Sequence, residues 1–183
     1  MGELGKPIWL HPTRSDQWAD YPHEERSKHD IWWSLGWPYE TSVAMARLVF
    51  SGRLEQFPDL KIITHHVGAM VAPMSGRLAV PAFRPDARPI SGEPLDYFRR
   101  FYADTAAFGA PHSVRCSLEF LGVEHMLFGT DLPLGGNGTG NVPRGEAVVR
   151  EMTTAIEALD LPRRDLELIY HGNAEWILGL GGA

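Results

Sequence analysis

Four short, almost entirely apolar segments recur along the chain, and they constrain its fold more than any other feature. They occupy residues 7–11, 61–65, 100–104 and 126–130. A strand that is buried on both faces of a sheet reads as a continuous apolar run, whereas a half-exposed antiparallel strand alternates between apolar and polar residues. The sequence therefore predicts four strands of a parallel sheet that is covered on both sides.

Helical patterns separate these segments. Apolar residues at helical spacing predict a helix over 39–50, and further helices are predicted over 73–80, 94–100, 111–121 and 146–159. Alternation of strand and helix is typical of parallel βα units. Because the chain is 44% hydrophobic and 22% charged and carries no internal repeat or linker, residues 1–183 are expected to form a single α/β domain.

Residues with metal-binding chemistry follow three of the four apolar segments. His11 ends the first segment, His65 and His66 end the second, and Asp131 comes directly after the fourth. The carboxyl ends of parallel strands lie at one edge of a sheet, so these side chains are expected to meet there. Imidazoles and a carboxylate are the groups that hold a divalent metal in hydrolytic or decarboxylating sites.

The longest connections follow strands, where a (β/α) barrel builds its active site. Residues 12–38 are rich in aromatic and charged side chains, and residues 132–145 are rich in glycine. The glycine-rich segment is interpreted either as a lid or as a plain connection.

Composition and charge exclude several classes of protein. The formal net charge is −6 without a basic cluster, so neither nucleic acid nor an anionic membrane is expected as a partner. The single cysteine excludes an internal disulfide, and no apolar stretch approaches the roughly 18 residues of a membrane-spanning helix. The first residues also lack the apolar core of a signal peptide. We expect a cytoplasmic protein that acts on a small molecule.

The same segments resemble the amidohydrolase-related family that includes aminocarboxymuconate-semialdehyde decarboxylase. The resemblance runs from about residue 5 to residue 178, with the motifs in family order. They are Ile-Trp-Leu-His-Pro at 8–12, Gly-Trp-Pro-Tyr-Glu-Thr at 36–41, the segment 57–68 ending in Thr-His-His-Val-Gly, Phe-Tyr-Ala-Asp-Thr at 101–105, Leu-Phe-Gly-Thr-Asp at 127–131 and His-Gly-Asn-Ala-Glu at 171–175.

This resemblance implies a metalloenzyme with a TIM (β/α)8-barrel fold. Transferred by motif position, His11 is a metal ligand after strand 5, His66 a proton-handling residue near the metal after strand 6, and Asp131 a metal ligand and catalytic residue after strand 8. His66 can also serve as a third ligand. His66 is preferred over His65 because it precedes the turn Val-Gly-Ala, and strand alternation then points His65 away from His66. The implied cofactor is a divalent metal, Zn²⁺ first, with Mn²⁺ or Mg²⁺ as alternatives.

One departure from the family changes the interpretation of the whole chain. Family members begin with a strand carrying His-x-His or Glu-x-His, and no two histidines here have that spacing. A complete barrel takes about 250 residues, so 183 residues match about four βα units, strands 5 to 8 of the family barrel. A half-barrel has two open edges and an uncovered apolar face. Self-association, docking to a partner, and marginal stability with aggregation are the alternatives, and we expect a homo-oligomer if the chain is soluble alone.

Two functions remain open from the sequence. The first is a metal-dependent carboxy-lyase, or a hydrolase, acting on a small aromatic or unsaturated carboxylic acid. The second is a truncated, non-catalytic half-barrel that needs a partner or is an inactive remnant.

Several residues also have two interpretations. Trp32, Trp33 and Trp37 either line a substrate pocket or pack in the core of the long connection. Asp104 either orients the substrate or caps a helix beginning near residue 108. Asp131 taken alone could cap the next turn.

Overall fold

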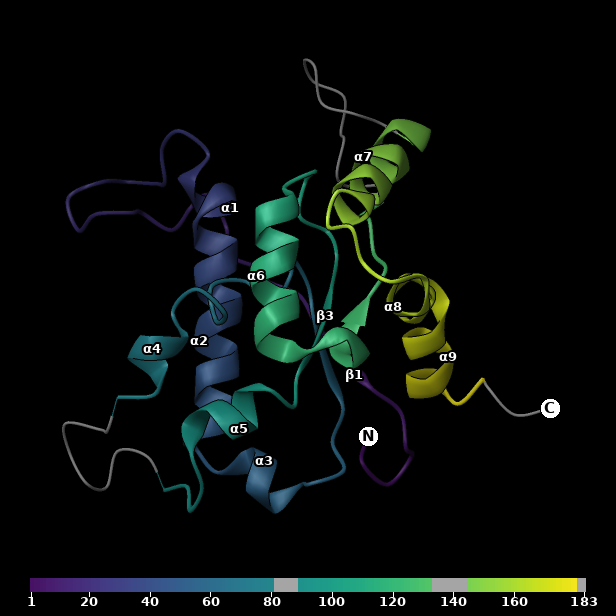
Figure 1. The fold of residues 1–183 in the computed structure, drawn as a ribbon. Coiled ribbons are helices and arrows are strands. Elements are labelled where there is room, and N and C mark those ends of the chain that lie inside the picture. The colour runs from purple at the N-terminus through teal and green to yellow at the C-terminus, as the bar shows by residue number, and fades with distance from the viewer. Residues whose placement is uncertain (81–88, 133–144, 181–183) are drawn as a thin grey trace.

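The computed structural model describes residues 1–80, 89–132 and 145–180. Within them, a single sheet contains four parallel strands in sequence order, with helices in the connections (Figure 1). The strands are β1 (Ile8–Leu10), β2 (Ile62–Thr64), β3 (Tyr102–Asp104) and β4 (Met126–Leu127). Each strand lies inside a predicted apolar segment, so the predicted α/β class and parallel sheet are confirmed. Residues 133–144 lie outside the described residues, and both interpretations of that segment stay predictions.

The strand register places the carboxyl ends of the strands side by side. Leu10 pairs with Thr64, Thr64 with Ala103, and Ala103 with Met126. All residues of β2, β3 and β4 are buried, as their apolar sequences predict. The residues that follow these strands therefore emerge at a common edge of the sheet.

A helix lies in each of the five segments that the sequence predicts to be helical, and prolines in the first turns help to set where three of them begin. Pro94 and Pro111 occupy the first position of their helices, where the missing amide hydrogen has no helical partner to lose. The predicted helix 39–50 begins three residues earlier, at Gly36, because Pro38 is tolerated in a first turn. The helices are α1 (Ile31–Ser34), α2 (Gly36–Phe50), α3 (Arg53–Gln56), α4 (Ser75–Leu78), α5 (Pro94–Phe98), α6 (Pro111–Leu121), α7 (Glu146–Glu157), α8 (Arg163–Glu167) and α9 (Asn173–Leu178), with a short 3-10 helix η1 (Val123–His125) and a π-helix η2 (Leu168–Gly172).

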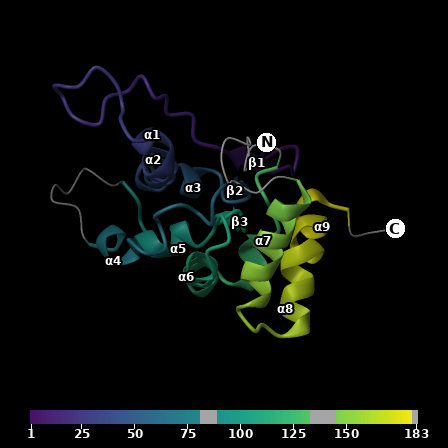
Figure 2. The ribbon, with the colours of Figure 1, turned by 90° about the horizontal axis from the view of Figure 1, so that it is seen from above.

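Helices lie on more than one side of the sheet. In both ribbon views, α2 to α5 lie together on one side and α7 to α9 on the other (Figures 1 and 2). Two apolar clusters, one around Met45 and Phe98 and one around Val114 and Ile156, pack along the helices. Among the described residues, no helix has the length and apolar character needed to cross a membrane.

The sheet face that was predicted to be uncovered is largely covered by α9. Ile177 of this helix packs with Ile63, Tyr102 and Leu127, and all four side chains are buried. At β1 the prediction is met, because the side chain of Trp9 is 51% exposed. No strand of the described residues pairs with the outer edge of β1. The outer edge of β4 likewise has no strand partner in the described part of the chain, although the amide of Phe128, directly after β4, donates to the carbonyl of Ile169 in η2 at 2.8 Å.

Candidate metal centre

Three side chains that the sequence singles out meet at the carboxyl edge of the sheet. His11 follows β1 directly, His66 lies two residues beyond β2, and Asp131 lies four residues beyond β4. One potential ligand atom from each of the three lies within 4.8 Å of the others, and all three residues are half-buried. The predicted convergence of these residues is therefore present. Two imidazoles and a carboxylate match the donor types that zinc and manganese sites use.

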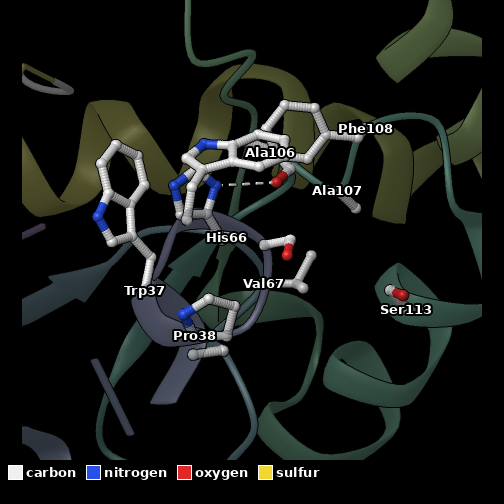
Figure 3. Close-up of a pocket in the computed structure, with 11 residues that line it drawn as sticks. Trp37, Pro38, His66, Val67, Ala106, Ala107, Phe108 and Ser113 are labelled. Carbon is white, nitrogen blue, oxygen red and sulfur yellow. Dashed lines mark hydrogen bonds between the residues drawn. The ribbon is translucent and has the colours of Figure 1, made fainter. Parts of the chain in front are cut away.

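Backbone carbonyls orient both imidazole rings. Nδ1 of His11 lies 2.6 Å from the carbonyl oxygen of Pro12, and Nδ1 of His66 lies 3.2 Å from that of Ala106 (Figure 3). A carbonyl only accepts hydrogen bonds, so each Nδ1 carries the proton and each Nε2 keeps its lone pair. Nε2 of His66 is buried and has no hydrogen-bond partner among the described residues. This arrangement fits a metal-ligating or proton-accepting nitrogen.

His66 begins a left-handed turn, which comprises residues 66–69. The φ angles of His66, Val67, Gly68 and Ala69 are 57°, 53°, 71° and 58°. Left-handed backbone costs a non-glycine residue about 1–2 kcal/mol, and for a β-branched residue such as Val67 it is rare. A run of such residues persists only where surrounding contacts hold it, and functional sites are where such strain is concentrated.

Three side chains from three different elements support the left-handed turn. Asp104 at the end of β3 accepts a hydrogen bond of 2.8 Å from the backbone amide of His66. Ser117 of α6 donates to the carbonyl oxygen of Val67, and Ser42 of α2 accepts from the amide of Met70 at 2.9 Å. The position of His66 therefore depends on residues that lie 24 to 51 positions away in the sequence.

The predicted orientation of His65 is wrong. Its ring lies beside those of His11 and His66, with centroid separations of 4.9 and 5.9 Å, rather than pointing away. Strand alternation fails because β2 ends at Thr64 and the chain enters the left-handed turn two residues later. His65 lies outside the group of three potential ligands, and the preference for His66 as the functional histidine stays a prediction.

A carboxylate holds the ring of His65. Its Nδ1 lies 2.8 Å from Oδ2 of Asp104. Hydrogen bonding to Asp104 raises the pKa of His65, burial opposes this, and the negative charges of Asp104 and Asp131 add to the increase.

The helix-capping interpretation of Asp104 is also wrong. The next helix, α6, begins at Pro111 and has no side-chain cap. Asp104 is 6% exposed, and its carboxylate turns back to His65, to the amide of His66 and to the amide of Ala106. Asp104 is not among the residues that line the pocket beside the site, and a role in orienting substrate stays a prediction.

Asp131 adopts a left-handed backbone conformation, with a φ of 64°. The turn bond that follows is made by Thr130, whose Oγ1 accepts from the amide of Leu132 at 3.3 Å. Capping of the next turn by Asp131 would involve residues from 133 onward, which lie outside the described residues, so this alternative stays a prediction. The Asp131 carboxylate offers a potential ligand atom close to those of the two histidines.

A cavity of about 360 Å³ adjoins His66, a volume within the usual range for small-molecule sites. Trp33 and Trp37 line it, as one interpretation predicts, whereas Trp32 is not among the lining residues and packs edge-on against Trp37 at 5.4 Å. Phe108 also lines the cavity and stacks on the ring of His66 at 5.8 Å (Figure 3). The sequence does not predict this role of Phe108, because nothing local distinguishes it from a core phenylalanine.

Known proteins share both the sequence and the fold. The 6-methylsalicylic acid decarboxylase of Penicillium expansum is 29% identical over 182 residues, which cover 95% of this chain and 50% of that protein. The 2-amino-3-carboxymuconate-6-semialdehyde decarboxylase of Dictyostelium discoideum is 25% identical over 97% of this chain and 46% of its own length. The chain thus spans about half the length of these curated relatives.

Solved structures show the same relation. A dihydroxybenzoic acid decarboxylase from Polaromonas sp. JS666, solved with bound manganese and the inhibitor 2-nitroresorcinol, matches with a TM-score of 0.78 and 23% identity. The match covers 100% of this chain and 52% of that one. Such neighbours are TIM barrels, and the four parallel strands correspond to about half of their chains. Because the family model described as Amidohydrolase matches residues 1–180, this chain belongs to the amidohydrolase family.

Proposed function

We propose that this chain binds a divalent metal through His11 and Asp131 and acts in the non-oxidative decarboxylation of a small aromatic carboxylic acid. The single observation that carries the proposal is the convergence of His11, His66 and Asp131, with potential ligand atoms within 4.8 Å of one another. Relatives named as decarboxylases of 6-methylsalicylic acid and of dihydroxybenzoic acid support the reaction class.

The metal would be held by His11 Nε2 and the Asp131 carboxylate, with His66 as a third ligand where no substrate is bound. Zn²⁺, Mn²⁺ and Mg²⁺ are the candidates, and the manganese in the Polaromonas structure favours testing Mn²⁺ beside Zn²⁺. When bound, the ion supplies Lewis-acid polarisation of a substrate oxygen.

His66 is the residue we assign to proton transfer. In decarboxylation, the bond between the ring carbon and the carboxylate breaks, CO₂ leaves, and the electron pair remaining on the carbon takes up a proton, which the doubly protonated ring of His66 would give from Nε2 while Nδ1 keeps its own. His66 belongs to the ligand group and also lines the cavity, so we assign its Nε2 to proton exchange with a substrate bound beside the ligands. The carbonyl of Ala106 holds the proton on Nδ1 and keeps Nε2 as the exchanging nitrogen.

The cavity supports an aromatic substrate. Trp33, Trp37 and Phe108 contribute flat rings to its lining, and Ala106 and Ala107 contribute small side chains. Flat apolar walls with few polar groups favour a planar, monocyclic acid whose carboxylate points to the metal.

Assembly is part of the proposal. Three potential ligands come from this chain, the outer edge of β1 has no strand partner among the described residues, and Trp9 is half-exposed. An unpaired apolar edge favours association with another chain. We propose a homo-oligomer in which β1 is covered, and sedimentation as a stable monomer at micromolar concentration would contradict it.

The test combines metal binding with turnover. Titration calorimetry with Mn²⁺, Zn²⁺ and Mg²⁺ is expected to show binding that His11→Ala and Asp131→Ala abolish, whereas His112→Ala, an exposed histidine outside the ligand group, leaves it unchanged. His66→Ala is expected to retain measurable metal binding but to abolish CO₂ release.

CO₂ release is then measured from 6-methylsalicylate and 2,6-dihydroxybenzoate. Absence of metal binding in the unaltered chain would refute the proposal. Metal binding without CO₂ release would instead support the second candidate, a non-catalytic half-barrel, which the half-length coverage of the relatives favours.

A further inference from the structure

The strand that supplies none of the three potential ligands occupies a central place beside the site. β3 lies between β2 and β4 in the sheet, and its last residue is Asp104. The carboxylate of Asp104 is buried, and Asp104 is not among the residues that line the cavity. A buried carboxylate requires compensating contacts, and those of Asp104 all go to residues around the histidines.

One oxygen of Asp104 acts on both ends of His66. Oδ1 accepts from the backbone amide of His66 at 2.8 Å, which anchors the first residue of the left-handed turn. The same Oδ1 accepts from the amide of Ala106 at 3.0 Å. The carbonyl of Ala106 in turn lies 3.2 Å from Nδ1 of His66. The carboxylate thereby fixes both the backbone of His66 and the acceptor that orients its ring.

The other oxygen of Asp104 contacts His65, whose ring packs against His11. Oδ2 lies 2.8 Å from Nδ1 of His65, and the ring of His65 packs edge-on against that of His11 at 4.9 Å. Asp104 thus contacts the backbone amides of His66 and Ala106, which position His66, and the ring of His65, which packs against His11.

The residues that follow β4 also lie close to the end of β3. A Cβ atom on Gly129 would come within 2.9 Å of the Cβ of Asp104, so only glycine permits this approach. Thr105 Oγ1 joins the two strand ends through bonds of 3.1 Å to both the amide and the carbonyl of Gly129. Asp131 follows two residues later, so the same junction also places the carboxylate ligand.

We propose that Asp104 is a positioning residue that sets the ring orientation and tautomer of His66, and thereby the metal affinity of the site. The statement about His66 stands on the hydrogen bonds alone, whereas the consequence for metal rests on the proposed function. Residues that orient metal-ligating histidines typically change metal affinity 10–100-fold when removed.

The tautomer of His66 distinguishes the two possible roles of Asp104, because a residue that only stabilises the fold would leave this tautomer unchanged. Long-range ¹H–¹⁵N spectra of the metal-free full chain are expected to show the proton on Nδ1 of His66, against the preference of free imidazole for Nε2. Asp104→Ala removes both amide contacts and is expected to shift His66 toward the Nε2-protonated form. Mn²⁺ affinity, measured by titration calorimetry, is expected to fall at least about tenfold.

A matched control separates this effect from loss of sheet stability. Thr64 is fully buried and also links β2 to β3, through a bond of 2.8 Å from Oγ1 to the carbonyl of Tyr102, but it makes no hydrogen bond to His66. Thr64→Val is expected to destabilise the fold and leave the tautomer of His66 unchanged. A His66 tautomer in Asp104→Ala identical to that of the unaltered chain would overturn the proposal.

Asp104→Asn keeps the test decisive if the alanine variant does not fold. The amide oxygen of asparagine can accept from both backbone amides, so His66 is expected to keep its tautomer while only the signals of His65 shift. A change of the His66 tautomer in Asp104→Asn would overturn the proposal. If the unaltered chain binds no Mn²⁺, the proposed function fails, and the tautomer comparison still tests Asp104.

Discussion

Replacing Ser117 by alanine tests whether the left-handed turn depends on contacts from distant elements. Ser117 is 1% exposed, and its hydroxyl donates to the carbonyl of Val67, 50 residues earlier in the chain. Alanine leaves that carbonyl, on a buried residue, without this donor. An unsatisfied buried polar group costs about 1–3 kcal/mol. We therefore expect the free energy of unfolding to fall by about 2 kcal/mol, which for a chain of this size corresponds to a melting temperature lower by roughly 4–8 °C.

Urea denaturation followed by circular dichroism measures this change, and the chain supplies a matched control. Ser113 lies in the first turn of the same helix α6, so Ser113→Ala makes the same chemical change, but Ser113 lines the cavity. Its effect on the free energy of unfolding is expected to stay within about 0.5 kcal/mol. Equal effects of the two substitutions would refute the view that the Ser117 hydroxyl supports the turn.

Three further outcomes follow from contacts elsewhere in the fold. Hydrogen bonds from Tyr97 and Ser91 lower the pKa of the Glu55 carboxyl to about 2. The ionised group therefore stabilises the fold at a pH above its ordinary pKa, and this stabilisation is lost as the pH falls from about 4.5 toward 2. The difference in urea midpoint between the unaltered chain and Glu55→Gln should shrink over that pH range, and a constant difference would contradict this prediction. Ala69 has a φ of 58°, a left-handed conformation that glycine adopts without strain. Ala69→Gly should therefore raise the free energy of unfolding by up to about 1 kcal/mol, measured by thermal denaturation. A loss of stability would mean that the backbone is not strained at this residue. Asn173 is buried and donates two hydrogen bonds of 2.8 Å to the backbone carbonyls of Val123 and Met126. Asn173→Ala should therefore lower the free energy of unfolding, measured by urea denaturation, by about 2–4 kcal/mol. A decrease below about 1 kcal/mol would show that water replaces the side chain.

The amino-acid sequence determines the class of fold and the location of the candidate site. Continuous apolar runs predict buried parallel strands, and each run contains a strand of the sheet. Because the carboxyl ends of parallel strands share one edge, the sequence predicts that His11, His66 and Asp131 meet there, and in the structure they do. Local patterns suffice here because the periodicity of a strand and the direction of a parallel sheet follow from the backbone itself.

Long-range packing supplies the remainder. The left-handed turn at 66–69 turns His65 toward His11, against the alternation of an ideal strand, and it is supported by Asp104 and Ser117 from other elements. The stacking of Phe108 on His66 and the burial of one sheet face by α9 likewise join residues far apart in sequence. No local propensity encodes these contacts, because their free energy arises only when the separate elements have come together.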